Sequence, residues 1–186
     1  DLAEYYAEEG YTVLAPDLFW RMEPDVELGY SEEEFQKAFG FYQQFDIAKA
    51  IEDMQASASA LRSHDACKGK IGAVGFCLGG KLSYLAAAHC NLDAAVSYYG
   101  VGIEADLDLK DQITCPMVMH FAELDQFVPA EAREEITNAF SGRADIETYT
   151  YPGTDHAFNT PGRDSYHKPS AMMAHSRSMA CFRRAL

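Results

Sequence analysis

The sequence predicts an α/β fold built on a mainly parallel β-sheet with helices on both faces. Short apolar runs of strand length alternate along the chain with longer segments whose apolar residues recur at helical spacing. One such run, Lys70–Phe76, passes almost without a loop into the Ala- and Leu-rich helical segment Leu78–His89. Alternation of this kind is typical of parallel sheets, in which the loops at the carboxyl ends of the strands carry the site.

The first third of the chain contains one expected strand and one long expected helix. Apolar residues recur at near-helical spacing before Gly10, so the sequence is expected to open inside or just before a helix. The run Tyr11–Ala15 is β-rich and closed by proline, which predicts a buried strand. Ser31 is the expected N-cap of the helix, whose periodicity extends over residues 35–64 with a break near Gly40.

The remaining two thirds alternate regularly between strands and helices. Besides the strand and helix around residue 77, the apolar or β-rich runs predict three more strands. These strands are Ala94–Tyr99, Pro116–Ala122 and Ile146–Tyr151, and the further expected helices are Ala130–Phe140 and Ser170–Leu186. With 186 residues, of which 48% are hydrophobic, the chain is expected to form a single domain over residues 1–186.

Charge and hydropathy exclude several classes of partner. The formal net charge of -14 at pH 7 repels nucleic acid and anionic lipid, so neither partner is expected. No stretch approaches the roughly 20 apolar residues that cross a bilayer. The first residues lack the basic and apolar parts of a signal peptide, which makes the cytoplasm the expected location.

The five cysteines do not suggest a metal site or a disulfide framework. They form no CxxC pair and no Cys/His spacing typical of zinc binding, which favours free thiols in a reducing compartment. No metal and no cofactor is therefore expected. Taken singly, each cysteine is best interpreted as a small buried apolar residue.

One cysteine stands in a different context. The segment Gly75-Phe76-Cys77-Leu78-Gly79-Gly80 is a G-x-C-x-G pattern between a strand and a helix, where glycines on both sides of the nucleophile allow a strained turn. At the amino end of the helix, Cys77 is expected to act as a nucleophile, and the backbone N–H of Leu78 to stabilise an oxyanion. The alternative is a buried cysteine in a glycine-rich turn. This elbow narrows the fold to an α/β-hydrolase-like one.

A cysteine nucleophile needs a base and an acid, and in this fold they follow it in the order nucleophile, acid, histidine. Asp125 lies in a loop after a predicted strand and is the preferred acid, with Glu123 and Asp155 as alternatives. His156 lies in the loop after the last strand and is the preferred base. The other histidines, among them His120 inside a strand, are interpreted as structurally satisfied or exposed.

With these residues placed, the chain resembles the dienelactone hydrolase family over nearly its whole length. The segments that carry the resemblance are Ala15-Pro16-Asp17-Leu18, Phe45-Asp46 in the long helix, the G-x-C-x-G elbow, Ser97-Tyr98-Tyr99-Gly100-Val101-Gly102, Asp125-Gln126-Phe127-Val128-Pro129-Ala130 and Gly153-Thr154-Asp155-His156-Ala157-Phe158. The resemblance implies a carboxylic ester hydrolase of the carboxymethylenebutenolidase type with a Cys77-His156-Asp125 triad. It also implies further amino-terminal strands, so the sequence is expected to be N-terminally incomplete.

The expected substrate is a small-molecule ester or lactone. In dienelactone-cleaving members two arginines hold the substrate carboxylate, and the matching places here have Phe35 and Thr160, which disfavours a carboxylated dienelactone. Arg21 and Arg163 are the arginines that could replace them. Apolar side chains that could line the pocket or pack the core are Phe35, Phe39, Tyr42, Tyr99 and Phe158. The alternative functions are a non-catalytic ligand-binding or scaffold protein and a thiol redox protein.

Overall fold

The computed structural model describes residues 2–186, which form two compact units. The first unit ends at Gly69 and the second extends from Lys70 to Leu186. Each unit is described by itself below. The expectation of a single domain over residues 1–186 stays a prediction.

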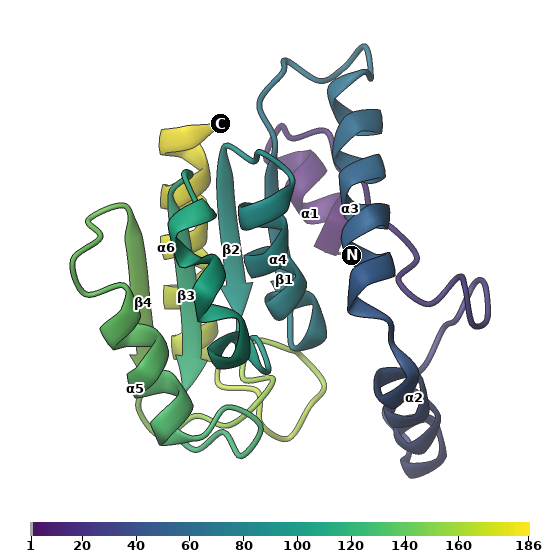
Figure 1. The fold of residues 1–186 in the computed structure, drawn as a ribbon. Coiled ribbons are helices and arrows are strands. Elements are labelled where there is room, and N and C mark those ends of the chain that lie inside the picture. The colour runs from purple at the N-terminus through teal and green to yellow at the C-terminus, as the bar shows by residue number, and fades with distance from the viewer. Residues whose placement is uncertain (1) are drawn as a thin grey trace. The chain divides into compact units, whose positions relative to one another are not determined.

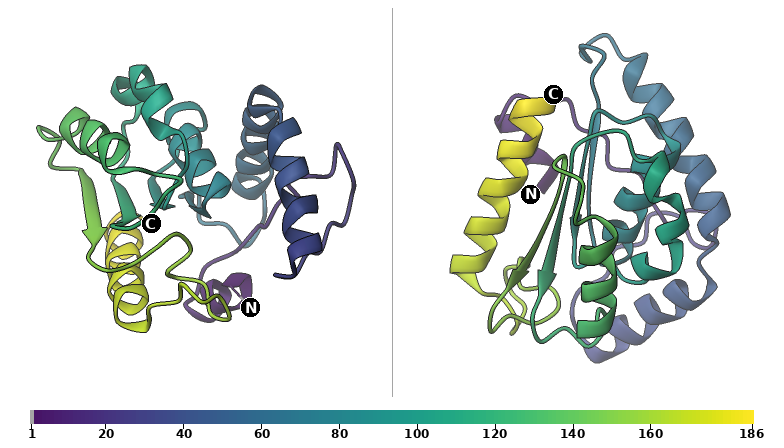
Figure 2. Two further views of the ribbon diagram at one scale, coloured as in Figure 1. Left: turned by 90° about the horizontal axis from the view of Figure 1, so that it is seen from below. Right: turned by 60° about the vertical axis from the view of Figure 1, so that its left-hand side comes forward.

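The second unit is a four-stranded parallel sheet with helices on both faces, which confirms the predicted fold class (Figure 1). Its strands lie in the order β1-β2-β3-β4. In chain order the elements are β1 (Gly72–Phe76), α4 (Leu78–His89), β2 (Ala94–Tyr98), η1 (Ile103–Gln112), β3 (Met117–Ala122), α5 (Ala130–Ala139), β4 (Ile146–Tyr151) and α6 (Lys168–Ala185). Seen from below, α4 and α5 cover one face and α6 the other (Figure 2).

The core of this unit follows from strands that are covered on both faces. Every residue of β2 and β3 is buried, which explains why these runs are continuously apolar rather than alternating. Helix α4 is buried over most of its length, in keeping with its Leu- and Ala-rich sequence. Because the strands are parallel, the loops after β1, β3 and β4 meet at one edge of the sheet (Figure 1).

The boundaries of the second unit agree closely with the sequence analysis. Helix α4 and strand β4 have the predicted ends, and the other strands and helices differ by one or two residues. The 3-10 helix η1 was not predicted, because its alternating acidic and apolar residues have no α-helical period.

The first unit contains three helices, α1 (Leu2–Glu8), α2 (Glu32–Gln44) and α3 (Ile47–Arg62). Ser31 caps α2 as predicted, in a capping box with Glu34. The long helix was predicted to break near Gly40, which is wrong: Gly40 lies inside α2. The break comes instead at Asp46, whose carboxylate accepts a hydrogen bond from the N–H of Lys49 and begins α3. Asp46 is therefore an N-cap and not an interior residue of a long helix.

The strand predicted at Tyr11–Ala15 is absent, since these residues have no regular secondary structure. The N–H of Tyr11 donates a hydrogen bond to the carbonyl of Tyr6, and the hydroxyl of Thr12 donates one to the carbonyl of Ala66. Neither hydrogen bond belongs to a β-ladder. A β-rich run becomes a strand only where a neighbouring backbone pairs with it. The predicted burial is also wrong, because Leu14 is 47% exposed.

Candidate active site

Cys77 lies at the tight turn between β1 and α4 and has a strained backbone. Its φ of 55° and ψ of -116° are unusual for a residue with a side chain. The turn is held by a hydrogen bond from the N–H of Cys77 to the carbonyl of Tyr98 in β2 (3.0 Å). The thiol is neither fully buried nor fully exposed. The N–H of Leu78 lies in the first turn of α4, where N–H groups lack helical partners and can stabilise an anion.

The glycines around Cys77 do not all serve the close approach that the sequence predicts. A Cβ at Gly75 would lie 1.9 Å from the carbonyl oxygen of Gly79, and one at Gly80 would lie 2.6 Å from the carbonyl oxygen of Tyr98. A Cβ at Gly79 would meet nothing within 4 Å, so the prediction is wrong for this glycine. The close contacts of the elbow are made by Gly75 and Gly80.

This difference gives a matched pair of variants. Gly75→Ala is expected to destabilise the protein by at least about 3 kcal/mol, because its methyl group overlaps backbone that cannot move aside. Gly79→Ala lies in a helix and faces open space, so it should be neutral or stabilise by up to about 1 kcal/mol. Urea unfolding measures both changes. A Gly75→Ala variant as stable as Gly79→Ala would contradict this account of the elbow.

Asp125 and His156 are hydrogen-bonded to one another. Oδ2 of Asp125 lies 2.8 Å from Nδ1 of His156. The other oxygen, Oδ1, accepts hydrogen bonds from the N–H groups of Phe127 (2.8 Å) and Val128 (3.2 Å), which fixes the carboxylate in the loop after β3. The side chain of Asp125 is fully buried, whereas that of His156 is 16% exposed. The acid is thus held rigidly and the imidazole reaches the surface.

The alternative acids make other contacts. The carboxylate of Glu123 accepts a hydrogen bond from the N–H of Gly153 (2.7 Å), and that of Asp155 accepts one from the N–H of His156 (2.6 Å). Of the three candidate acids, Asp125 is the one bonded to the imidazole ring.

The two loops that carry these residues are tied together by backbone hydrogen bonds. The N–H of Glu123 bonds to the carbonyl of Tyr151, and the N–H of Leu124 to the carbonyl of Thr154 (3.2 and 2.8 Å). Arg133 of α5 donates to the carbonyls of Glu123 and Val128, at either end of the Asp125 loop. Acid and base therefore lie on a shared frame.

The imidazole of His156 is held between two aromatic rings and beside the thiol. Its ring centroid lies 4.8 Å from that of Tyr99 and 4.9 Å from that of Phe127. Burial disfavours the imidazolium, but hydrogen bonds and charge interactions with Asp125 and Cys77 outweigh it and raise the pKa of His156 to about 9. Since Nδ1 faces Asp125, Nε2 is the nitrogen available to the Cys77 thiol.

The candidate pocket residues separate into two groups. Tyr99 and Phe158 are buried in the second unit, with ring centroids 5.7 Å apart, and Tyr99 also contacts His156. Phe35 and Phe39 belong to α2 of the first unit, where their half-exposed rings stack on one another. Their part in a pocket stays a prediction.

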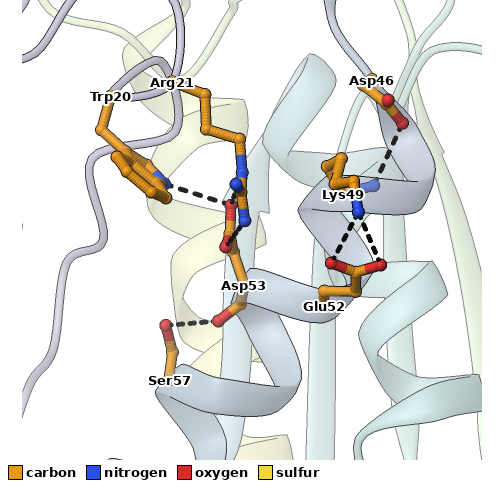
Figure 3. A network of polar contacts seen from close by, with 7 residues as sticks. All are labelled: Trp20, Arg21, Asp46, Lys49, Glu52, Asp53 and Ser57. Atoms are coloured by element: carbon orange, nitrogen blue, oxygen red, sulfur yellow. Dashed lines mark hydrogen bonds and ion pairs between the residues drawn. The ribbon is translucent and has the colours of Figure 1, made fainter.

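The arginine proposed as a carboxylate ligand in the first unit already has a carboxylate partner. Arg21 binds Asp53 through Nε (3.0 Å) and Nη2 (2.6 Å), and the indole of Trp20 donates to the same carboxylate (Figure 3). The hydrogen bond from Arg21 lowers the pKa of Asp53, so this acid is charged at neutral pH and neutralises the guanidinium. The resemblance matches Thr160 to the second carboxylate-binding arginine of the family. Its hydroxyl lies 3.3 Å from the hydroxyl of Tyr99.

Comparison with known proteins shows the family to which the chain belongs. The model of the dienelactone hydrolase family matches residues 1–186. The chain belongs to the dienelactone hydrolase family. This membership agrees with the predicted resemblance and supports a hydrolase that acts on an ester or a lactone.

Individual members of the dienelactone hydrolase family are similar over most of the chain. A candidate carboxymethylenebutenolidase of Azospirillum brasilense is 37% identical over 188 residues, which cover 100% of this chain and 80% of that protein. The carboxymethylenebutenolidase of Pseudomonas putida is 32% identical over 180 residues, covering 96% and 76%. The crystal structure of a candidate dienelactone hydrolase from Klebsiella pneumoniae superposes with a TM-score of 0.82 at 28% identity, covering 97% and 78%.

One aromatic ring that lies against the imidazole was not among the predicted site residues. Phe127 was noted only as part of a motif, yet its ring is 53% exposed and lies against the imidazole. Its signal was its position two residues after the candidate acid, in a loop where an exposed phenylalanine is unusual.

Residues 2–186 contain no group of three or more His, Cys, Asp and Glu side chains arranged to hold a metal ion. The helices in the same range include none with the length and hydropathy needed to span a bilayer.

Proposed function

We propose that this protein is a carboxylic ester hydrolase that cleaves a small-molecule ester or lactone through a covalent intermediate on Cys77. The observation that carries the proposal is the contact series from Asp125 to His156 to the Cys77 thiol beside the amino end of α4. A nucleophile, a base and an orienting acid in this order is the arrangement of acyl transfer. The five free thiols support the cytoplasm as its location.

In the first step, Nε2 of His156 takes the proton of the Cys77 thiol, the sulfur attacks the carbonyl carbon, and the negative charge on oxygen is stabilised by the N–H of Leu78. The carbon–oxygen bond to the leaving group then breaks. The imidazolium of His156, which a pKa of about 9 keeps protonated at neutral pH, gives its proton to that oxygen. A thioester on Cys77 remains.

In the second step, water attacks the thioester carbonyl while neutral His156 accepts a proton from the water. The carbon–sulfur bond breaks, the carboxylic acid leaves, and the thiolate–imidazolium pair is restored. Asp125 holds Nδ1–H and stabilises the imidazolium in both steps. These steps use only side chains and backbone of the chain and need no cofactor.

The surroundings of His156 favour an apolar or aromatic substrate over a carboxylated one. The rings of Tyr99 and Phe127 flank the imidazole, and Phe127 presents an exposed face there. Thr160 carries no positive charge at a place where the family resemblance implies a carboxylate-binding arginine, and the guanidinium of Arg21 is already paired with Asp53. A thiolate is also a good leaving group, which favours activated esters and strained lactones over amides.

The covalent intermediate provides the test. Brief incubation with p-nitrophenyl acetate, followed by acid quenching and mass spectrometry, is expected to show one acetyl group on the peptide that contains Cys77. The Cys77→Ala variant, which keeps the other four thiols, should show no acetylated peptide. Turnover of the ester without any adduct on Cys77 in the wild type would overturn the proposal.

A further inference from the structure

A buried hydrogen-bond network lies between the sheet and α6 in the second unit, behind the candidate active site. Its centre is His120 of β3, which is completely buried. Nε2 of His120 lies 2.9 Å from the hydroxyl of Ser178 in α6, and Nδ1 lies 3.0 Å from the hydroxyl of Tyr151 in β4. Tyr98 of β2 adds a bond to Ser178 (2.7 Å), and Arg177 of α6 donates to the hydroxyl of Tyr151 (3.0 Å).

The number of hydrogens that each group can donate fixes the direction of the hydrogen bonds around Ser178. The hydroxyl of Ser178 donates its one hydrogen to the carbonyl of Ala174 (2.9 Å). It must therefore accept both from the hydroxyl of Tyr98 and from His120. His120 consequently carries its hydrogen on Nε2.

The direction at the other ring nitrogen follows from the arginine. A guanidinium only donates, so the hydroxyl of Tyr151 accepts from Arg177 and gives its own hydrogen to Nδ1 of His120. Burial, with the nearby charge of Arg177, lowers the pKa of His120 to about 3, which agrees with a neutral ring at every physiological pH. The network thus has one arrangement, in which the hydroxyl hydrogens of Tyr98, Tyr151 and Ser178 and the Nε2–H of His120 each have an acceptor.

The same residues touch the backbone of the candidate site. The carbonyl of Tyr151 accepts from the N–H of Glu123 and from the hydroxyl of Thr154, which belong to the loops of Asp125 and His156 respectively. The carbonyl of Tyr98 accepts from the N–H of Cys77. The side chains of these two tyrosines are fixed by the network while their backbones hold the nucleophile and the base.

We propose that His120 is a positioning residue: as an acceptor for Tyr151 it holds the end of β4, and through it the loops in which Asp125 orients His156. The inference rests on the proposed function and deepens it. In this proposal the two ring nitrogens of His120 have different roles. The Nε2 half attaches the sheet to α6, and the Nδ1 half fixes the loops of the site.

Two substitutions separate these halves. In His120→Asn the side-chain oxygen lies near the position of Nδ1 and can still accept from Tyr151, whereas the bond to Ser178 is lost. In His120→Gln the amide nitrogen lies near the position of Nε2 and can still donate to Ser178, whereas Tyr151 loses its acceptor. Each variant loses one buried hydrogen bond, so comparable reductions in thermal stability are expected.

The expected kinetic effects differ. His120→Asn should keep kcat for p-nitrophenyl acetate within about threefold of the wild type, whereas His120→Gln should lower kcat about 10- to 100-fold with KM nearly unchanged. Equal losses of kcat in both variants, in proportion to their losses of stability, would reduce His120 to a purely structural role.

A pair of tyrosines provides a milder test if either histidine variant fails to fold. Tyr151→Phe removes only the hydroxyl that bonds to His120, and a kcat about tenfold lower is expected. Tyr149→Phe is the matched control, since the hydroxyl of Tyr149 on the same strand donates to Glu147, outside the chain of bonds to His120. It should retain wild-type kcat. Equal kcat values in the two variants would overturn the inference.

A second readout does not depend on turnover. Titration of His156 by NMR should give a lower pKa in His120→Gln and Tyr151→Phe than in the wild type, because the contact with Asp125 is loosened. An unchanged pKa in both would count against positioning. Failure of the proposed function is distinct from this, since the wild type would then form no adduct on Cys77.

Discussion

Replacing Cys77 with alanine is expected to lower kcat/KM for p-nitrophenyl acetate by about 10⁴-fold or more. The proposed mechanism forms its only covalent bond to substrate through this sulfur, and a methyl group cannot replace it. When one member of a catalytic unit is removed, nearly all of the rate enhancement is lost. A small residual enhancement remains, which comes from the oxyanion donor and substrate binding. Steady-state hydrolysis at neutral pH measures the change.

The control for this variant is Cys67→Ala. Cys67 is the one other cysteine that is not buried, and it belongs to the first unit, whereas Cys77, Asp125 and His156 belong to the second. Wild-type rates are expected for it. If Cys77→Ala hydrolysed the ester as fast as Cys67→Ala, the cysteine nucleophile would have to be abandoned, and the family fold would be left with a different or non-catalytic role.

The parts of the fold that sequence predicted well are those whose signals are local. The start of α4 follows from the Gly-Cys elbow before Leu78, and its end at His89 precedes Asn91, a residue type that tolerates the positive φ of 50° found there. The loops of Asp125 and His156 were placed by the strands before them, which are continuous apolar or β-rich runs. Each of these features depends on neighbours within a few residues.

The errors arose where the outcome depends on partners far away in sequence. Tyr11–Ala15 has the composition of a strand, but a strand needs a second backbone to pair with. The contact of Phe127 with His156 depends on where two loops meet. No pattern in the sequence could assign the tautomer of His120, because its partners come from α6 and β4.

The sequence predicts backbone strain at Cys77 but not at two other residues of the candidate site. Tyr99 and Ala157 also have positive φ values, of 38° and 64°, although neither is glycine. The ring of Tyr99 packs on His156, and Ala157 is the next residue in the sequence after His156. Strain at non-glycine residues persists only where surrounding contacts over-determine the backbone. Its gathering around the thiol and the imidazole supports a site whose geometry is held at a cost in stability.

Replacing Asp125 with asparagine is expected to lower kcat about 10³- to 10⁴-fold while the fold is retained. Oδ1 of Asp125 accepts hydrogen bonds from the N–H groups of Phe127 and Val128, so the amide oxygen of the variant must take that place. Its NH₂ group then faces Nδ1 of His156 and donates to it. The imidazole proton is thereby moved to Nε2, where the ring can no longer accept the proton of the Cys77 thiol.

The same variant makes a prediction about pH with a definite sign. In the wild type the folded protein holds the His156 proton up to a pKa of about 9, so this proton stabilises the fold fully below about pH 6.5, the unfolded value, and the contribution disappears as the pH rises through 9. Asp125→Asn removes a hydrogen bond and a charge that raise this pKa, so NMR titration of His156 should give a lower value. Asp155→Asn, which keeps an oxygen for the N–H of His156, should leave the titration and kcat near those of the wild type. Were Asp155→Asn the variant that lost activity while Asp125→Asn kept it, the orienting acid would be Asp155, and the 2.8 Å contact of Asp125 would be structural.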